Sequence, residues 1–142
     1  MQIMTRRVHV YETDVMGIVH HSNYIRFCEE ARVRFCEKFE LLDLQVNHNE
    51  EAVHGLTVIG LRFDYKKPLR FHDEFFIEIQ GQQIGIKLIL QYKIFKKTLT
   101  HPELCVVAQT DHCSLSQELK VQRPTKQYLA KTKELPWTET WL

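Results

Sequence analysis

The sequence predicts an α+β domain in which one long helix lies on the concave face of an antiparallel sheet. Two observations predict this arrangement. Apolar residues recur at steps of three and four only between residues 23 and 42, whereas after residue 55 they alternate with polar residues in successive segments. No repeat, low-complexity block or linker divides the chain, so we expect a single domain over residues 1–142.

The first part of the chain predicts a short strand and the helix. Residues 6–11 alternate well enough for a strand. From Asn23 to about Leu42, apolar side chains follow one face of a helix roughly 30 Å long, and charged side chains fill the opposite face. Ser22 or Asn23 is the expected N-cap, because short polar side chains accept hydrogen bonds from the first turn. A polar connection over residues 44–54 follows.

Four strands and a short helix are expected after this connection. In residues 55–65 the alternation changes parity at Gly60, which predicts a β-bulge. Residues 75–80 form the next strand, and a turn at Gly81 leads into the clearest strand, with apolar residues alternating through residues 84–94. Residues 104–115 are apolar on both faces, which indicates a central or covered strand. Residues 123–135 contain the short helix.

The composition argues against several classes of protein. The 19 Lys and Arg residues nearly cancel the 18 Asp and Glu residues, and no basic stripe is present, so we expect no nucleic-acid partner. The start of the chain lacks the apolar run of a signal peptide, and no segment approaches the ~20 apolar residues that span a bilayer. We therefore expect a cytoplasmic protein without an integral membrane segment.

Neither disulfides nor a metal site is expected from the cysteines and histidines. Cys28 and Cys36 are eight positions apart on the helix, about 12 Å, whereas a disulfide requires Cα atoms within about 7 Å. The four cysteines contain no C-x-x-C pair, and we expect buried, reduced thiols. Adjacent residues such as His20 and His21 rarely both bind one ion, and no other histidine has a recognised ligand spacing, so we expect no metal.

The stretch DVMGIVHHSNY, residues 14–24, carries chemistry that a structural element does not require. Asp14 could close a strand, Gly17 could supply a positive φ angle, and the two histidines could be solvated. However, N–H groups at a helix start have no intrahelical partner and carry partial positive charge, so they can receive a carbonyl oxygen that becomes an oxyanion. A carboxylate from the preceding loop could reach the same carbonyl carbon, which is the outline of acyl transfer.

At these residues the chain resembles a known enzyme family. The matching residues are Asp14, Gly17, Ile18, Val19, His21, Asn23, Tyr24, Phe27, Glu29, Ala31 and Arg32. They resemble the signature of the hotdog-fold acyl-CoA thioesterases of the 4-hydroxybenzoyl-CoA thioesterase type, and look closest to the bacterial branch associated with the Tol-Pal system. A weaker resemblance continues through Tyr65, Pro68, Asp73 and Glu74. The resemblance implies the hotdog fold, a long central helix wrapped by a curved antiparallel β-sheet.

The resemblance also implies roles for individual residues. The catalytic aspartate of the family falls on Asp14, and Gly17 of the same motif is counted with Asp14 and His21 among the expected catalytic-site residues. Its oxyanion donor, a backbone N–H, falls on His21, whose side chain matches a histidine implicated in catalysis in the Tol-Pal-type branch. Tyr24 and His20 would bind substrate, although relatives commonly carry an aromatic residue in place of His20. The resemblance implies homodimers with side-by-side sheets, active sites at the dimer interface, and a tetramer formed as a dimer of dimers.

Two variants of the chemistry stay open. An aspartate, with a reference pKa of about 3.9, is a poor base toward water at pH 7, which favours direct attack by Asp14 and a mixed anhydride. His21 would assist the hydrolytic water or the thiolate. General-base catalysis by Asp14 is the alternative. A rival acid on the helix would be Glu29 or Glu30, and the latter is placed to pair with Arg34.

The substrate class follows from the resemblance, and its acyl group stays open. Coenzyme A would need cations for its phosphates, for which Lys66 and Arg70 are candidates, and no cofactor is expected because CoA is part of the substrate. Short or long aliphatic and aromatic acyl groups are all compatible, as is 1,4-dihydroxy-2-naphthoyl-CoA or an acyl carrier protein thioester. A hydratase or dehydratase on the same fold and a non-catalytic acyl-CoA-binding module are the remaining alternatives. The sequence has no match to the motif of the hydratase branch, and Asp14 and Gly17 argue against the binding module.

Overall fold

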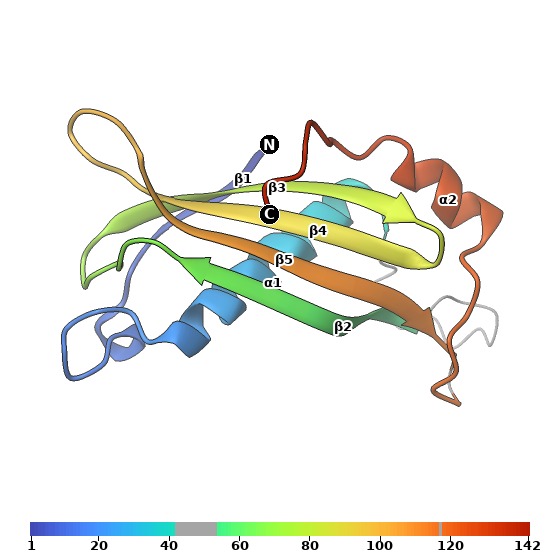
Figure 1. Cartoon of the computed structure of the whole chain (residues 1–142), viewed down its shortest axis with the longest axis horizontal. Coiled ribbons are helices and arrows are strands. Elements are labelled where there is room, and N and C mark those ends of the chain that lie inside the picture. The colour runs from blue at the N-terminus through green and yellow to red at the C-terminus, as the bar shows by residue number, and fades with distance from the viewer. Residues whose placement is uncertain (42–53, 117) are drawn as a thin grey trace.

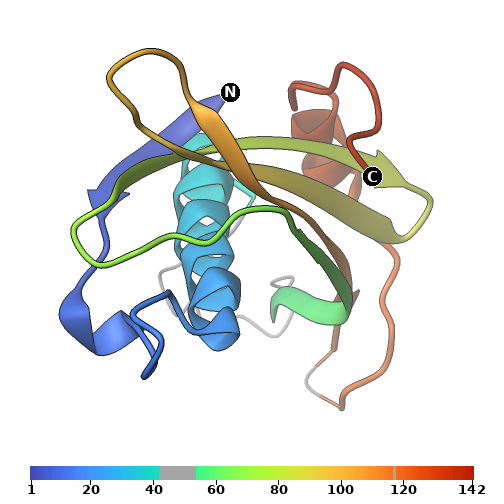
Figure 2. The ribbon, with the colours of Figure 1, turned by 60° about the vertical axis from the view of Figure 1, so that its left-hand side comes forward.

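The computed structural model describes residues 1–41, 54–116 and 118–142. The elements are β1 (Gln2–Arg7), the 3-10 turn η1 (Val10–Glu12), α1 (His21–Lys38), β2 (His54–Tyr65), β3 (Glu74–Ile84), β4 (Lys87–Lys96), β5 (Glu103–Leu115) and α2 (Lys126–Thr132). All strand pairs are antiparallel, in one open sheet of order β1-β3-β4-β5-β2. Helix α1 runs along the sheet (Figure 1), which curves around it (Figure 2). The predicted α+β class and hotdog architecture are confirmed.

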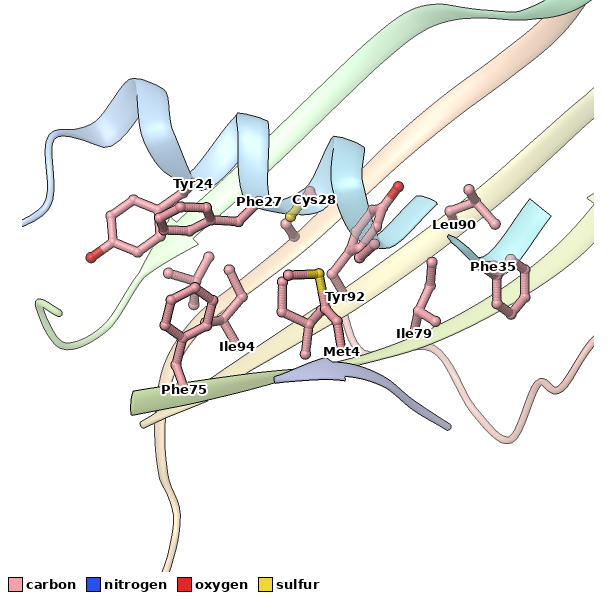
Figure 3. Close-up of a cluster of buried hydrophobic side chains, with 14 of the residues drawn as sticks. Met4, Tyr24, Phe27, Cys28, Phe35, Phe75, Ile79, Leu90, Tyr92 and Ile94 are labelled. Atoms are coloured by element: carbon pink, nitrogen blue, oxygen red, sulfur yellow. The ribbon is translucent and has the colours of Figure 1, made fainter. Parts of the chain in front are cut away.

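The core lies between α1 and the concave face of the sheet. Figure 3 shows Phe27 and Phe35 of α1 directed at side chains from β3 and β4, among them Phe75 and Leu90. All four are fully buried, and the rings of Phe27 and Phe75 are 4.8 Å apart. Because burial of one such side chain stabilises a fold by about 1.5–3 kcal/mol, this interface is a main source of stability. It also holds the start of α1 against the sheet.

Helix α1 is shifted relative to the prediction. The predicted N-cap was wrong: His20 takes this position, with φ −64° and ψ 138°, and its Nδ1 accepts the Ser22 N–H at 3.2 Å. The helix ends at Lys38 instead of Leu42, because Glu40 adopts φ 56° and the Leu41 N–H donates to the Cys36 carbonyl at 2.8 Å. This is a Schellman motif in which glutamate takes the left-handed position that glycine usually occupies.

The first predicted strand was also displaced. Strand β1 covers Gln2–Arg7, and residues 10–12 form a 3-10 turn instead of continuing the strand. The Val8 N–H donates to the Asp73 carbonyl at 2.9 Å, after which the chain leaves the sheet. The Glu12 carboxylate then accepts the His9 N–H at 2.8 Å, which closes the turn.

The turn predicted at Gly81 was wrong, and the structure gives a different reason for this glycine. Gly81 lies inside β3, opposite Leu90, and the turn instead contains Gly85, with φ 59°. A Cβ atom at position 81 would lie 2.6 Å from a methyl group of Leu90 and 3.2 Å from the Phe35 ring. The missing side chain therefore permits close packing of α1 on the sheet. Residue 84 accordingly ends β3 instead of belonging to β4.

Other predictions are confirmed. The β2–β5 register shifts between Val58 and Gly60, as expected for a bulge. Residues 105–108 of β5 are all buried, and α2 lies within the predicted range. Of the predicted polar connection, residues 44–53 lie outside the described residues, and His54 begins β2.

All four cysteines are free and buried, as predicted. Burial raises the pKa of Cys28, and it raises the pKa of Cys36 to about 12, so both thiols are protonated at neutral pH. Within the part of the chain that the structure describes, no helix has the length and apolar character needed to cross a membrane.

The C-terminal residues lie across the outer face of β3 and β4. Gln80 accepts the Thr138 N–H at 3.1 Å, and Gln91 accepts the Trp141 N–H at 2.8 Å. The Lys93 ammonium lies 4.5 Å from the centre of the Trp141 ring, at cation–π distance. The chain end is visible beside these strands in Figure 1. Both glutamine side chains therefore lie on the face of the sheet opposite α1.

Candidate active site

Asp14 lies in a tight loop between η1 and α1. The strand-like bridge between Thr13 and Val19 closes the loop, and the Asp14 N–H donates to the Ile18 carbonyl at 2.8 Å. The Gly17 N–H donates to the Asp14 carbonyl at 3.0 Å, and Gly17 adopts φ 76°. One carboxylate oxygen of Asp14, Oδ1, accepts the Met16 N–H at 2.7 Å. The acid is thus held by its own turn, and it is partly exposed.

The start of α1 presents an N–H group without a partner. The Ser22 N–H is accepted by the His20 side chain, and the Asn23 N–H by the His20 carbonyl at 2.9 Å. The His21 N–H donates to no group within the described residues. As the first N–H of an 18-residue helix, it also carries the partial positive charge of the helix dipole. This N–H is therefore available to an oxyanion.

Asp14 and His21 both line a cleft of about 420 Å³. Its walls come from the Asp14 loop, the first turn of α1, and the end of β2 with the segment that follows it. Five of the residues predicted for the site line it: Asp14, His20, His21, Tyr24 and Lys66. The other lining residues are Ile18, Val19, Tyr65, Lys67 and Pro68. The structure therefore brings most of the predicted site together in one place.

Gly17 and Arg70 do not line this cleft. Gly17 has the positive φ angle that was its structural alternative, and an added Cβ would meet nothing within 4 Å. Its observed contribution is the shape of the Asp14 turn. Arg70 pairs through its backbone with Ile18, and its N–H donates to the Asp73 carboxylate at 2.7 Å. The backbone of Arg70 thus supports the Asp14 loop through Ile18, while its exposed side chain lies outside the cleft walls.

Two tyrosines form an aromatic wall of the cleft. The rings of Tyr24 and Tyr65 are 5.3 Å apart, and the Tyr65 hydroxyl donates to the His21 carbonyl at 3.4 Å. The Tyr24 hydroxyl accepts the Leu69 N–H at 3.0 Å. Burial raises the pKa of both phenols, so both are neutral at physiological pH. Tyr65 was not predicted as a site residue from the sequence. Its place in the weaker motif, three residues before Pro68, was the feature that could have indicated it.

Lysines lie at the same wall. Lys66 forms no ion pair with any described residue, whereas the Lys67 ammonium lies 3.8 Å from the Glu103 carboxylate. Farther along the sheet, Lys96 and Lys97 form ion pairs with Asp73 and Glu74. The cleft therefore has cationic side chains beside two histidines, an arrangement suited to an anionic ligand.

The two helix glutamates lie outside the cleft walls. Glu30 accepts from Arg34 at 3.2 Å, which confirms the predicted pair, and it also approaches Arg6 at 3.9 Å. Glu29 is exposed. Tyr11 is exposed as well and stacks on His9, with ring centres 5.2 Å apart.

A comparison with known families gives this geometry a context. The model of the Thioesterase-like superfamily matches residues 8–138, which include the Asp14 loop, α1 and most of the sheet. The chain belongs to this superfamily. It is therefore a thioester hydrolase, and the enzyme class expected from the Asp14–His21 motif is confirmed.

Individual relatives agree with this assignment. The acyl-CoA thioesterase YbgC of Helicobacter pylori is 28% identical over 130 residues, 92% of this chain and 81% of the relative. A 1,4-dihydroxy-2-naphthoyl-CoA hydrolase of Thermosynechococcus vestitus is 28% identical over 111 residues, 78% of this chain and 73% of the relative. The crystal structure of a 4-hydroxybenzoyl-CoA thioesterase variant with 4-hydroxybenzoyl-CoA shares the fold, with TM-score 0.82, 16% identity and coverage of 91% and 96%. The Tol-Pal association stays a prediction.

Proposed function

We propose that this thioesterase hydrolyses acyl-CoA to a free acid and coenzyme A. The observation that carries the proposal is that Asp14 and His21 line the same cleft, and that the His21 N–H has no partner within the described residues. Relatives named as acyl-CoA thioesterases support a CoA ester as the substrate. In this proposal the substrate carbonyl oxygen rests against the His21 N–H, and its carbon faces Asp14.

Asp14 acts as the nucleophile in our preferred mechanism. Its carboxylate attacks the carbonyl carbon, the electron pair moves onto the oxygen beside His21 N–H, and collapse expels the CoA thiolate. The mixed anhydride on Asp14 is then hydrolysed by water. The exposed His21 imidazole delivers a proton to the thiolate or takes one from the water. In the general-base alternative Asp14 activates water directly, without an anhydride.

Lys66 and Lys67 are the proposed contacts for the phosphates of coenzyme A. Both line the cleft, and Lys66 forms no ion pair with a described residue, so its charge is available to an anion. The chemistry needs no separate cofactor, because CoA arrives with the acyl group. Arg70 pairs through its backbone with Ile18 of the Asp14 loop, and we expect it to contribute less to CoA binding than the two lysines.

An aromatic acyl group is the second candidate. The Tyr24–Tyr65 pair offers flat rings to the cleft, which favours a planar acyl group. A relative named as a 1,4-dihydroxy-2-naphthoyl-CoA hydrolase supports this choice. Thiol release measured over a panel of short, long and aromatic CoA esters separates the two candidates, and an acyl carrier protein thioester extends the panel.

We also propose a homodimer formed through β2. This strand is at one edge of the sheet and exposes apolar side chains, among them Ile59 and Leu61 at 48% and 52% exposure. An unpaired apolar edge favours pairing with a second strand. The cleft contains Tyr65, the last residue of β2, so a partner at this edge would lie close to the site. Assembly of two dimers into a tetramer stays a prediction.

Substitution of Asp14 tests the function. Asp14→Asn should lower kcat by at least about 1,000-fold while KM changes little, because the neutral amide cannot attack a thioester. Glu29→Gln is the matched control and should retain activity. In a single turnover in heavy-oxygen water, label in the Asp14 carboxylate supports the anhydride, whereas label in the product acid alone indicates general-base catalysis. Loss of turnover in Glu29→Gln alone would overturn the assignment.

A further inference from the structure

The Asp14 loop and the first turn of α1 meet at one main-chain carbonyl. The Glu12 carbonyl oxygen accepts the His20 N–H at 2.9 Å and the Asn23 side-chain amide Nδ2 at 2.8 Å. Glu12 is two residues before Asp14, and its two donors lie on either side of His21 in the sequence. This carbonyl therefore links the chain just before Asp14 to the residues on both sides of His21.

Both ends of the Asn23–Glu12 contact are held in place. Asn23 is 8% exposed, and its backbone N–H is bonded to the His20 carbonyl. Glu12 is 5% exposed, and both of its carboxylate oxygens accept Arg6 Nη2 at 2.8 Å. The Arg6 guanidinium in turn lies 4.8 Å from the centre of the Phe27 ring. A change in the contact is therefore transmitted to the loop and to the helix start, and little of it is absorbed by side-chain motion.

We propose that Asn23 is a positioning residue that sets the separation between the Asp14 carboxylate and the His21 N–H. The inference rests on the proposed function. A reacting carboxylate and an oxyanion donor must be held within about 0.5 Å of their productive geometry, and a displacement of about 1 Å costs about 100-fold in rate. Asn23 is not among the residues that line the cleft, so it acts through Glu12 and not on the substrate. Its loss should therefore lower kcat and leave KM nearly unchanged.

Two substitutions of Asn23 remove the donated hydrogen bond. Asn23→Asp keeps the size of the side chain but has no N–H at neutral pH, and a carboxylate in the first turn is favourable toward the helix dipole, so the helix should be retained. Asn23→Leu removes the polar group altogether. For both variants we expect kcat to fall about 10- to 100-fold, with KM within about twofold of the wild type.

Gln91→Leu is the matched control for the loss of a buried amide. Gln91 is 1% exposed and bonds to Gln109 and Thr140 on the opposite face of the sheet, so this variant should lose thermal stability but retain kcat within about twofold. The thermal unfolding transition of each variant is measured by circular dichroism, and the kinetics are measured at a temperature below it. Unchanged kcat in Asn23→Asp, or a change in KM alone, would overturn the positioning role.

The same assay separates this inference from the proposed function. A wild-type protein that releases no thiol, or an Asp14→Asn variant as active as the wild type, would overturn the proposed function and the inference with it. An active wild type that depends on Asp14 but whose Asn23→Asp variant keeps its kcat would overturn the inference alone.

Discussion

His21 brings two different groups to the cleft, a backbone N–H and an imidazole. The N–H is available because His20, which caps the helix, accepts the N–H groups of Ser22 and Asn23 and not that of His21. The imidazole is exposed and packs beside the His20 ring, with centres 4.2 Å apart. Ordinary side-chain substitution changes only the imidazole, so the backbone group needs a different experiment.

Proline at position 21 removes the N–H with little damage to the fold. Proline is favoured at the first helical position, and His20 has the φ and ψ values, −64° and 138°, that a residue before proline adopts. Relative to His21→Ala, which keeps the N–H, we expect His21→Pro to lower kcat by a further 100- to 1,000-fold or so, or about 2.7–4 kcal/mol. Equal kcat values for the two variants would show that the oxyanion is bound elsewhere.

At the scale of elements, the inner face of β5 carries polar groups into the core. His112 is fully buried, and its Nε2 forms a hydrogen bond with the Thr110 hydroxyl at 2.7 Å. The same hydroxyl contacts Tyr92 of β4 at 2.8 Å. His112 Nδ1 has no partner within the described residues. Desolvation, aided by the positive charge of Arg32 on α1, lowers the pKa of His112 to about 4. The imidazole is therefore neutral in the folded protein at pH 7.

This burial makes stability depend on pH in a defined direction. An unfolded histidine has a pKa near 6.5, so between pH 6.5 and about 4 the unfolded chain binds a proton that folded His112 does not bind. The free energy of unfolding should therefore fall as the pH decreases, by about 2 kcal/mol between pH 7 and pH 5 from this residue, with no further loss below about pH 4. Urea unfolding of His112→Gln should lack this component. An identical pH dependence in variant and wild type would contradict it.

At the scale of the whole molecule, the open sheet leaves β2 with one unpaired side. The opposite edge strand, β1, pairs with β3 and contributes the buried Met4 to the core, whereas β2 exposes several apolar side chains. Exposed apolar edges are uncommon on monomeric proteins because they promote association. The proposed dimer would cover this edge and bring two clefts close together.

A charge on β2 tests the dimer. Leu61→Lys should shift the sedimentation mass from twice 17.0 kDa to 17.0 kDa, because a lysine at a strand edge opposes pairing with a second copy. Leu99→Lys, at a fully exposed position between β4 and β5, is the matched control and should not change the mass. A wild-type protein that sediments as a monomer at micromolar concentration would exclude the proposed interface.

Much of the site was predictable from one short stretch, and the missing parts have physical reasons. Asp14, His20, His21 and Tyr24 lie within eleven residues, so a loop followed by a helix brings them together without help from the sheet. Tyr65 is 44 positions from His21, and its contact with the His21 carbonyl depends on how β2 approaches α1. No local pattern carries that information.

The apolar periodicities determined the α+β class, the single long helix and the number of strands after it, because side-chain spacing follows directly from helix and strand geometry. Tertiary structure decided where those elements begin and end. Gly81 is read as a turn residue from its neighbours, yet it lies in β3 because the ring of Phe35 needs its space. Asn23 is read as a helix cap, yet His20 caps the helix and the Asn23 side chain donates to the Glu12 carbonyl, because a buried amide needs a partner and the fold brings the preceding loop within its reach.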